Sequence, residues 1–338
     1  MKIPIFSTLE QACACVGIVP RKASRIFTVT DEADGGRHGR GAGRIRMFDD
    51  GKGGICFNWR TGAEAVFFYD FNGVKPSRAE LARARAELCQ QRAETERRTR
   101  YRQMEVANLA AQIVSAASDS ADGHKYLRRK GLQAVPPWGG LRCIRAEVAQ
   151  TLIDGADIEQ EDGICQRLNM GGLLIVVPLV DAEGVVWSVQ LIDETGRKTF
   201  LKGGRKKGLL WCPDGALFNA KAAGAIGVAE GVATALSVNV LYGVPCVAAM
   251  DAGNLLPAAE GLWSRFCFRL AFYADRDQSR VGEEKAREAA LKLQGRGARC
   301  SVCVPDFTPE MEAAYVRDTG KAPTDFNDYL ALWSELND

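Results

Sequence analysis

The chain contains 338 residues, of which 46% are hydrophobic, and it carries a formal net charge of +2. This length and composition predict a sizeable buried core divided over two or three domains. No run of about 18 apolar residues occurs, and the first residues lack the apolar segment of a signal peptide, so we expect neither a membrane partner nor export. The eleven cysteines follow no disulfide pattern, which indicates reduced thiols and a cytoplasmic location.

The first 135 residues predict two regions. Residues 1–75 are glycine-rich and predict a small, mostly β N-terminal module. Residues 76–135 predict a helical basic linker, because neither Gly nor Pro interrupts the stretch from Ser77 to about Ala117, and Ser77 and Glu80 form a capping box. Four arginines, at positions 97, 98, 100 and 102, lie in the middle of this helix. A solvated helix face and a surface for nucleic acid both account for them.

Residues 136–221 predict a β-rich subdomain that ends in a strongly basic segment. The apolar run Leu173–Val180, a turn at 181–184 and the alternating segment 187–191 predict a hairpin. The segment 197–207 holds six cations and no acid: Arg197, Lys198, Lys202, Arg205, Lys206 and Lys207. A solvated loop would explain the six charges, but it would not explain the two glycines between them. The adjacent Gly203 and Gly204, which allow the backbone to approach a phosphate, favour nucleic-acid or nucleotide binding.

Residues 222–306 predict a compact α/β unit with a doubly wound, mostly parallel sheet. Strands are expected at 225–229, 244–249, 268–274 and 298–304, and helices at about 232–242, 255–265 and 282–294. Residues 307–338 predict a helical tail with an acidic motif around Asp325. The sequence contains no Gly-x-x-x-x-Gly-Lys-Ser/Thr loop, so no motor domain is expected.

Three carboxylates follow the predicted buried strands of this α/β unit. Glu230 ends one apolar run, and Asp275 and Asp277 end another. Because the carboxyl ends of parallel strands meet at one edge of a sheet, we expect these acids to lie together. At about 4 Å and an effective dielectric near 20, each pair repels by roughly 4 kcal/mol. A Mg²⁺ or Mn²⁺ ion removes that repulsion and in turn carries phosphates, so the pattern predicts phosphoryl chemistry.

Motifs in this region resemble those of a known family. Glu-Gly at 230–231 and Asp-x-Asp at 275–277, each at a strand end, resemble the Toprim domain that bacterial primases, topoisomerases and some nucleases share. Glu-Gly-Val-Ala-Thr-Ala at 230–235 is similar to the Glu-Gly-Tyr-Ala-Thr-Ala signature of primases from conjugative plasmids and satellite phages, with Val232 in place of the tyrosine. Residues 250–255 and 325–328 also resemble segments of primases, with Asn327 in place of an acid.

The resemblance implies a DNA primase, which synthesises short RNA primers on single-stranded DNA during replication or transfer of a mobile element. It assigns Asp275 and Asp277 to a Mg²⁺ site, Glu230 to the same site or to deprotonation of the attacking hydroxyl, and Asp325 to a further metal ligand. The basic residues of 197–207 would hold the template or the triphosphate. Nucleoside triphosphates, a single-stranded template and a replicative helicase are the implied partners.

The segment 48–62 resembles half of a primase zinc ribbon, but it offers one thiol, Cys56. A zinc ribbon needs four ligands, and neither His38 nor the distant Cys13 and Cys15 restores the spacing, so zinc is not expected. Two other functions remain open. A Toprim nuclease would use the same acids to hydrolyse a phosphodiester, and a non-catalytic relative of primases would bind single-stranded DNA alone.

Overall fold

The computed structural model describes residues 3–20, 26–29, 43–48, 51–58, 61–69, 78–132, 140–156, 158, 171–276 and 280–337. The chain divides into two compact units, Met1–Glu94 and Thr95–Asp338. The helix α2 (Arg78–Ala116) contributes residues to both of them. Within the described residues, no helix is both long and apolar enough to cross a membrane.

The first unit contains a five-stranded sheet and a short helix. The strands are β1 (Ile5–Phe6), β2 (Ile26–Val29), β3 (Gly43–Met47), β4 (Gly53–Asn58) and β5 (Glu64–Phe68), in the order β1-β5-β4-β3-β2. Helix α1 (Leu9–Val16), capped by Thr8, buries Cys13 and Val16 against Ile45, Cys56 and Phe67. The predicted β module therefore exists, with a helix that the sequence did not indicate.

The second unit begins with the C-terminal part of α2, which packs on an antiparallel sheet. Val106, Leu109, Ala110 and Ile113 bury one stripe of the helix among strand residues such as Leu174 and Leu191. The strands are β6 (Asp119–Ser120), β7 (Arg142–Arg145), β8 (Leu173–Val180), β9 (Val186–Ile192) and β10 (Lys198–Phe200), in chain order across the sheet. Helices α3 (Lys125–Arg129) and α4 (Ala146–Gly155) lie between β6, β7 and β8 in the chain. The predicted hairpin of β8 and β9 is confirmed.

The C-terminal part of this unit is a parallel sheet, as predicted. Its strands are β11 (Ala225–Ala229), β12 (Cys246–Ala248), β13 (Arg269–Tyr273) and β14 (Cys300–Cys303), in the order β12-β11-β13-β14 with every pair parallel. The helices are α5 (Ala216–Ala223), α6 (Val232–Tyr242), the short η3 (Ala252–Asn254), α7 (Leu255–Phe266), α8 (Val281–Gln294), α9 (Pro309–Thr319) and α10 (Phe326–Asn337).

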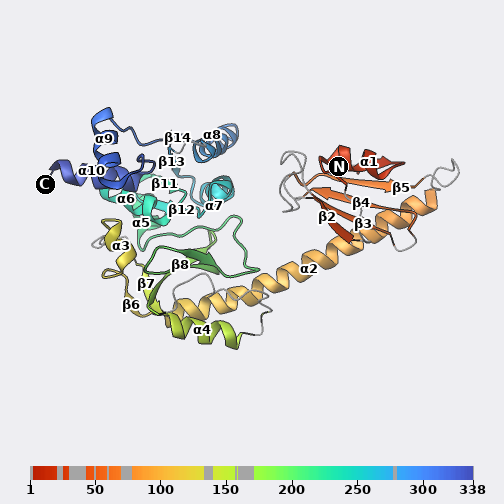
Figure 1. Ribbon diagram of the computed structural model, residues 1–338, viewed down its shortest axis with the longest axis horizontal. Helices are drawn as coiled ribbons and strands as arrows, with labels where there is room; N and C mark the ends of the chain where they lie inside the picture. The colour runs from red at the N-terminus through yellow and green to blue at the C-terminus, as the bar shows by residue number, and fades with distance from the viewer. Residues whose placement is uncertain are drawn as a thin grey trace. The chain divides into compact units, whose positions relative to one another are not determined.

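Helices cover both faces of the parallel sheet, so the sheet is doubly wound. Figure 1 shows α6 and α10 on one face and α7 and α8 on the other. On the first face, Val232 and Phe326 pack with Trp211 and with Cys143 of the antiparallel sheet in one continuous core. The boundary predicted near residue 221 falls between two sheets that share a core, and all the predicted domain boundaries stay predictions.

Candidate active site at the carboxyl edge of the parallel sheet

Glu230 and Asp275 lie at the point where the winding of the parallel sheet reverses. Strands β11 and β13 are neighbours, and Ala229 is paired with Tyr273, so Glu230 follows one strand directly and Asp275 comes two residues after the other. The chain leaves these two strands in opposite directions, because β12 lies beyond β11 and β14 lies beyond β13. Ligands of open α/β sheets bind at such a switch point.

The start of helix α8 closes tightly over these two acids. A Cβ atom placed on Gly282 would lie 3.5 Å from Oε2 of Glu230 and within 3.9 Å of the backbone of Asp275. The two acidic segments and the helix therefore converge on one point. Both acids are half-buried, and Oδ1 of Asp275 is shielded from solvent. Desolvation of two nearby carboxylates raises the free energy of their charged forms.

The donor set fits a hard divalent cation. The carboxylate oxygens of Glu230 and Asp275 are the ligand type that Mg²⁺ and Mn²⁺ prefer. Within the described part of the chain, no three acidic, cysteine or histidine side chains cluster at one point. Asp277, the third predicted ligand, lies outside the described residues. The binding of a metal ion by Glu230 and Asp275 therefore stays a prediction.

A third strand end contributes an acid that sequence reasoning did not assign to the site. Asp251 follows β12 and caps η3 by accepting a hydrogen bond from the backbone N–H of Asn254 at 2.9 Å. Its carboxylate also lies 3.8 Å from Nζ of Lys206. The signal was present in the sequence, because Asp251 follows a buried strand as Glu230 does. This ion pair brings the basic loop to the carboxyl edge of the parallel sheet.

Asn254 fastens the basic loop to the same edge. Its side chain is buried, accepts a hydrogen bond from the N–H of Gly208 at 2.7 Å, and donates to the carbonyl oxygens of Leu209 and Ala249, each at 2.7 Å. Trp211 and Ala248 exchange backbone hydrogen bonds as well. Main-chain and side-chain hydrogen bonds therefore hold the segment that follows the basic loop to β12 and to the residue after it.

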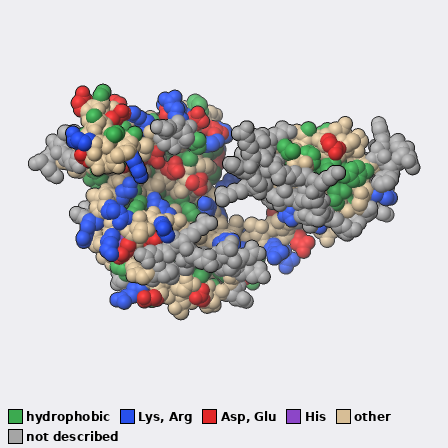
Figure 2. Space-filling view, viewed as in Figure 1, with side chains coloured by type: hydrophobic (Ala, Val, Ile, Leu, Met, Phe, Trp, Pro, Cys, Tyr) green, Lys and Arg blue, Asp and Glu red, His purple; other side chains and the backbone are tan. Residues whose placement is uncertain are grey.

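The predicted basic residues lie among aromatic rings. The guanidinium of Arg205 lies 5.0 Å from the ring centre of Trp187, and Nζ of Lys206 lies 4.2 Å from that of Phe200. Nζ of Lys198 lies 5.5 Å from the ring of Tyr126 in α3. Each contact stabilises a cation in place by about 0.5–1 kcal/mol at an exposed site. Figure 2 shows further Lys and Arg side chains gathered over α3, whose sequence is Lys-Tyr-Leu-Arg-Arg.

The two glycines of the basic loop have a packing role. A Cβ on Gly203, whose φ is 80°, would lie 2.8 Å from Nε of Arg102 in α2. A Cβ on Gly204 would lie 2.8 Å from Oγ of Ser188 and 3.0 Å from Val106. From the sequence, we interpreted these glycines as positions where the backbone approaches a phosphate. In the structure, the space beside them is filled by α2 and β9, which is the physical reason for glycine here.

Asp325 and Asp328 cap helix α10. Oδ1 of Asp325 accepts hydrogen bonds from the N–H groups of Asn327 and Asp328, each at 2.8 Å, and Oδ2 of Asp328 accepts one from Thr324 N–H at 2.8 Å. Burial raises the pKa of Asp325, and the Asp328 carboxylate raises it further. Thr324 in turn accepts a hydrogen bond from Arg276 N–H at 2.6 Å, so this motif adjoins the segment after β13. Its role as a metal ligand remains a prediction.

Asn327 takes the place of an acid for a structural reason. It is buried, and its amide donates to Lys130 O at 2.7 Å and to Oγ of Ser237 at 3.1 Å. It thereby ties α10 to α6 and to the residue after α3. An uncompensated carboxylate at this position would be costly, because burial of a charge without a partner is unfavourable.

The comparison with protein families decides the assignment of the parallel sheet. Residues 225–334 match the family model described as a Toprim domain. This part of the chain is a Toprim domain. Its match begins at β11 and ends within α10, so it includes Glu230, Asp275 and the capping motif around Asp325. The predicted fold class is therefore confirmed.

Curated relatives extend the similarity beyond the Toprim domain. The chain is 28% identical over 319 residues to a DNA primase TraC of Escherichia coli, an alignment that covers 91% of this chain and 26% of the relative. A second DNA primase TraC of Escherichia coli is 34% identical over 171 residues, which is 48% of this chain and 11% of the relative. The chain thus spans about a quarter of the length of the first relative and less of the second.

Solved structures with related folds include a DnaG primase catalytic domain bound to single-stranded DNA. That chain is 16% identical, with 70% of this chain and 80% of that chain covered and a TM-score of 0.42. The catalytic core of the Escherichia coli primase is 17% identical, with 65% and 76% covered and a TM-score of 0.39. The family assignment rests on the sequence matches.

Proposed function

We propose that this chain is a DNA primase of the plasmid type, which synthesises short RNA primers on a single-stranded DNA template. The Toprim match and the similarity to the two curated primases support the proposal. The observation that carries it is the position of the basic loop, which is held to the end of β12, the strand next to β11, and Glu230 directly follows β11.

A polymerising site must hold a template strand and a nucleoside triphosphate at once, so it needs cationic surface beside its acids. Lys206 pairs with Asp251 at the carboxyl edge, and Arg205 and Lys198 lie against aromatic rings on the adjoining surface. Lysine and arginine bind phosphates by charge, and the partly exposed ring of Trp187 can stack on an unpaired base. A nuclease needs only the scissile strand and a water, so this surface favours the primase.

Glu230, Asp275 and Asp277 hold Mg²⁺ in this proposal, with Asp325 as a further ligand. The ion, when bound, neutralises the triphosphate and lowers the pKa of the attacking 3′-hydroxyl. The carboxylates would hold the ion that binds the phosphates, and Lys202, Arg205, Lys206 and Lys207 would orient the template or the triphosphate, with Arg197 and Lys198 beside them. The protein acts in the cytoplasm, and a replicative helicase is the expected partner.

Substitution of the metal-binding acids tests this assignment. Asp275→Asn or Asp277→Asn should abolish primer synthesis, because an amide binds a hard cation far more weakly than a carboxylate does. Asp318→Asn, on the exposed surface of α9, is the matched control and should keep full activity. In a chelator, Asp275→Asn should melt at or above the wild-type temperature, since it relieves carboxylate repulsion. Primer synthesis by either acid variant would refute the site.

A further inference from the structure

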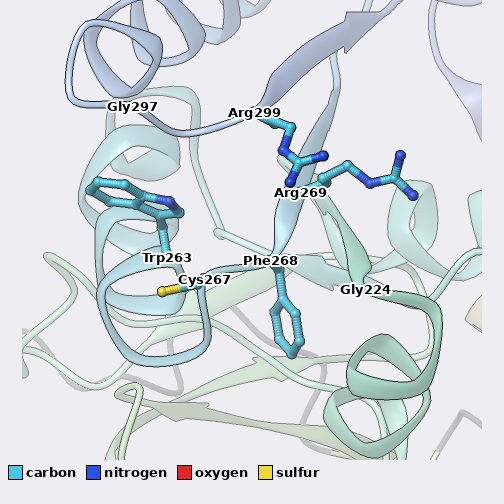
Figure 3. A pocket seen from close by; sticks show the side chains of 7 residues that line it. All are labelled: Gly224, Trp263, Cys267, Phe268, Arg269, Gly297 and Arg299. Carbon is cyan, nitrogen blue, oxygen red and sulfur yellow. The ribbon is translucent and has the colours of Figure 1, made fainter.

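A pocket of about 580 Å³ lies at the amino edge of the parallel sheet (Figure 3). It is lined by Gly224, Trp263, Cys267, Phe268, Arg269, Gly297 and Arg299. Arg269 is the first residue of β13, and Arg299 directly precedes β14. Glu230 and Asp275 follow the opposite ends of the strands, so the pocket is separate from the candidate active site.

Two arginines stand side by side at this edge. Leu270 is paired with Cys300, and Leu270 N–H donates to Arg299 O at 2.9 Å, so Arg269 and Arg299 start neighbouring strands about 4.8 Å apart. Both side chains are exposed, and neither forms an ion pair with any residue that the structure describes. Adjacent guanidinium groups repel, and an anion bound between them offsets that repulsion.

The other polar side chain of the pocket is also a donor. Figure 3 shows the indole nitrogen of Trp263 on the side of the ring that faces Arg299. The ring is held by Arg296, whose guanidinium lies 5.4 Å from its centre and which pairs with Glu260 at 2.6 Å. None of the seven lining residues is acidic. The lining therefore offers two guanidinium groups and an indole N–H, and no carboxylate.

Balancing of helix dipoles is the competing explanation for these cations. Helices α5, α7 and α8 all end at this edge, at the caps Gly224, Cys267 and Gly295, and helix C-termini carry partial negative charge. Their last turns already contain one cation each, Lys221, Arg265 and Lys292. Arg269, the first residue of β13, and Arg299, which directly precedes β14, are additional to these three cations.

We propose that this pocket binds a phosphate group, supplied either by a nucleotide or by the backbone of a single-stranded nucleic acid. The planar fork of arginine matches phosphate oxygens in a bidentate manner, and two such forks start from adjacent strands here. The volume falls within the range of about 300–1,000 Å³ that small-molecule sites occupy, so a whole nucleotide can enter. The site lies beyond the proposed function, because it uses neither the acids nor a metal ion.

Binding to the full chain in a chelator tests the proposal without the metal-dependent site. Inorganic pyrophosphate, ATP and a short oligo-dT are titrated by calorimetry into the wild type and into the double variant Arg269→Gln/Arg299→Gln. The variant Arg287→Gln/Arg317→Gln removes two exposed, paired arginines away from this edge and is the matched control. The variant Lys206→Ala/Lys207→Ala, with and without the two arginine substitutions, measures how much the basic loop contributes to the observed binding. Thermal denaturation reports on folding.

Loss of affinity by about tenfold or more in the double arginine variant, with the matched control close to wild type, is the expected result, and the same loss should appear when the arginines are replaced in the basic-loop variant. Loss for pyrophosphate and ATP identifies a nucleotide, whereas loss for oligo-dT alone identifies a nucleic-acid strand. Equal affinity of wild type and arginine variant for all three probes overturns the proposal. A lower melting temperature with unchanged binding also overturns it and assigns the arginines to the helix ends.

Discussion

At the scale of single residues, several positions carry a role that their sequence neighbourhood hides. Glycine beside lysines predicts contact with phosphate, yet Gly203 and Gly204 make room for Arg102 and for Ser188. The resemblance to primases sets Asn327 in the place of an acid, and in the structure it forms two buried hydrogen bonds. Both roles depend on residues far away in the chain, which is why local patterns could not predict them.

The packing role of Gly204 can be separated from a role in phosphate binding. Gly204→Ala should lower the free energy of unfolding by about 1–3 kcal/mol, because the added methyl group overlaps Ser188 and Val106. Gly123→Ala is the matched control, since nothing lies within 4 Å of a Cβ there, and it should leave stability unchanged or slightly higher. Urea denaturation gives both values. If Gly204→Ala has wild-type stability but binds DNA more weakly, Gly204 serves the approach of a phosphate and not packing.

The raised pKa of Asp325 predicts a pH-dependent stability. A carboxyl group whose folded pKa lies above the unfolded value of about 3.9 stabilises the fold at low pH and loses that contribution as pH rises through the folded pKa. Asp325→Asn keeps an oxygen that can cap α10 and removes the charge. In a chelator, its melting temperature should match the wild type near pH 4 and exceed it at pH 7. A variant less stable than wild type at pH 7 contradicts this account.

At the scale of elements, the parallel sheet was predictable and the connections between elements were not. Strands β11 and β13 are runs rich in apolar residues that end just before an acid, and β11, α6 and β8 have the bounds expected from the sequence. The short helices α1 and α4 were missed, because eight to ten residues hold little periodic signal. The buried Asn254, which binds the basic loop to β12, acts through tertiary contacts alone.

The basic loop should contribute charge to binding of single-stranded DNA. Replacement of Lys206 and Lys207 by Ala should weaken binding and reduce the slope of log affinity against log salt by about 0.7 per lost phosphate contact. Lys285→Ala/Lys292→Ala is the matched control, because both lysines lie on α8 and pair with Glu288. Fluorescence anisotropy over a salt series gives the slopes. An unchanged slope in the loop variant would show that these lysines are only solvated.

At the scale of the whole molecule, the chain forms two units, and each has its own hydrophobic core. The first unit encloses Cys13 and Cys56, whose sulfur atoms are 3.5 Å apart. A hydrogen bond to Cys13 and burial raise the pKa of the Cys56 thiol. The metal-free nature of this module, which would select the template, stays a prediction. The second unit joins the β-rich sheet and the Toprim domain through one core.

Primer synthesis on a single-stranded template is the most direct test of the central claim. Purified protein is incubated with labelled ribonucleotides, a single-stranded DNA template and Mg²⁺, and the products are separated by length on a gel, with Asp275→Asn as the inactive control. The wild type should make short RNA products that require the template, and Asp275→Asn should make none. The template should stay intact with both proteins. Degradation of the template without incorporation of nucleotides would contradict the primase and assign the Toprim site to a nuclease.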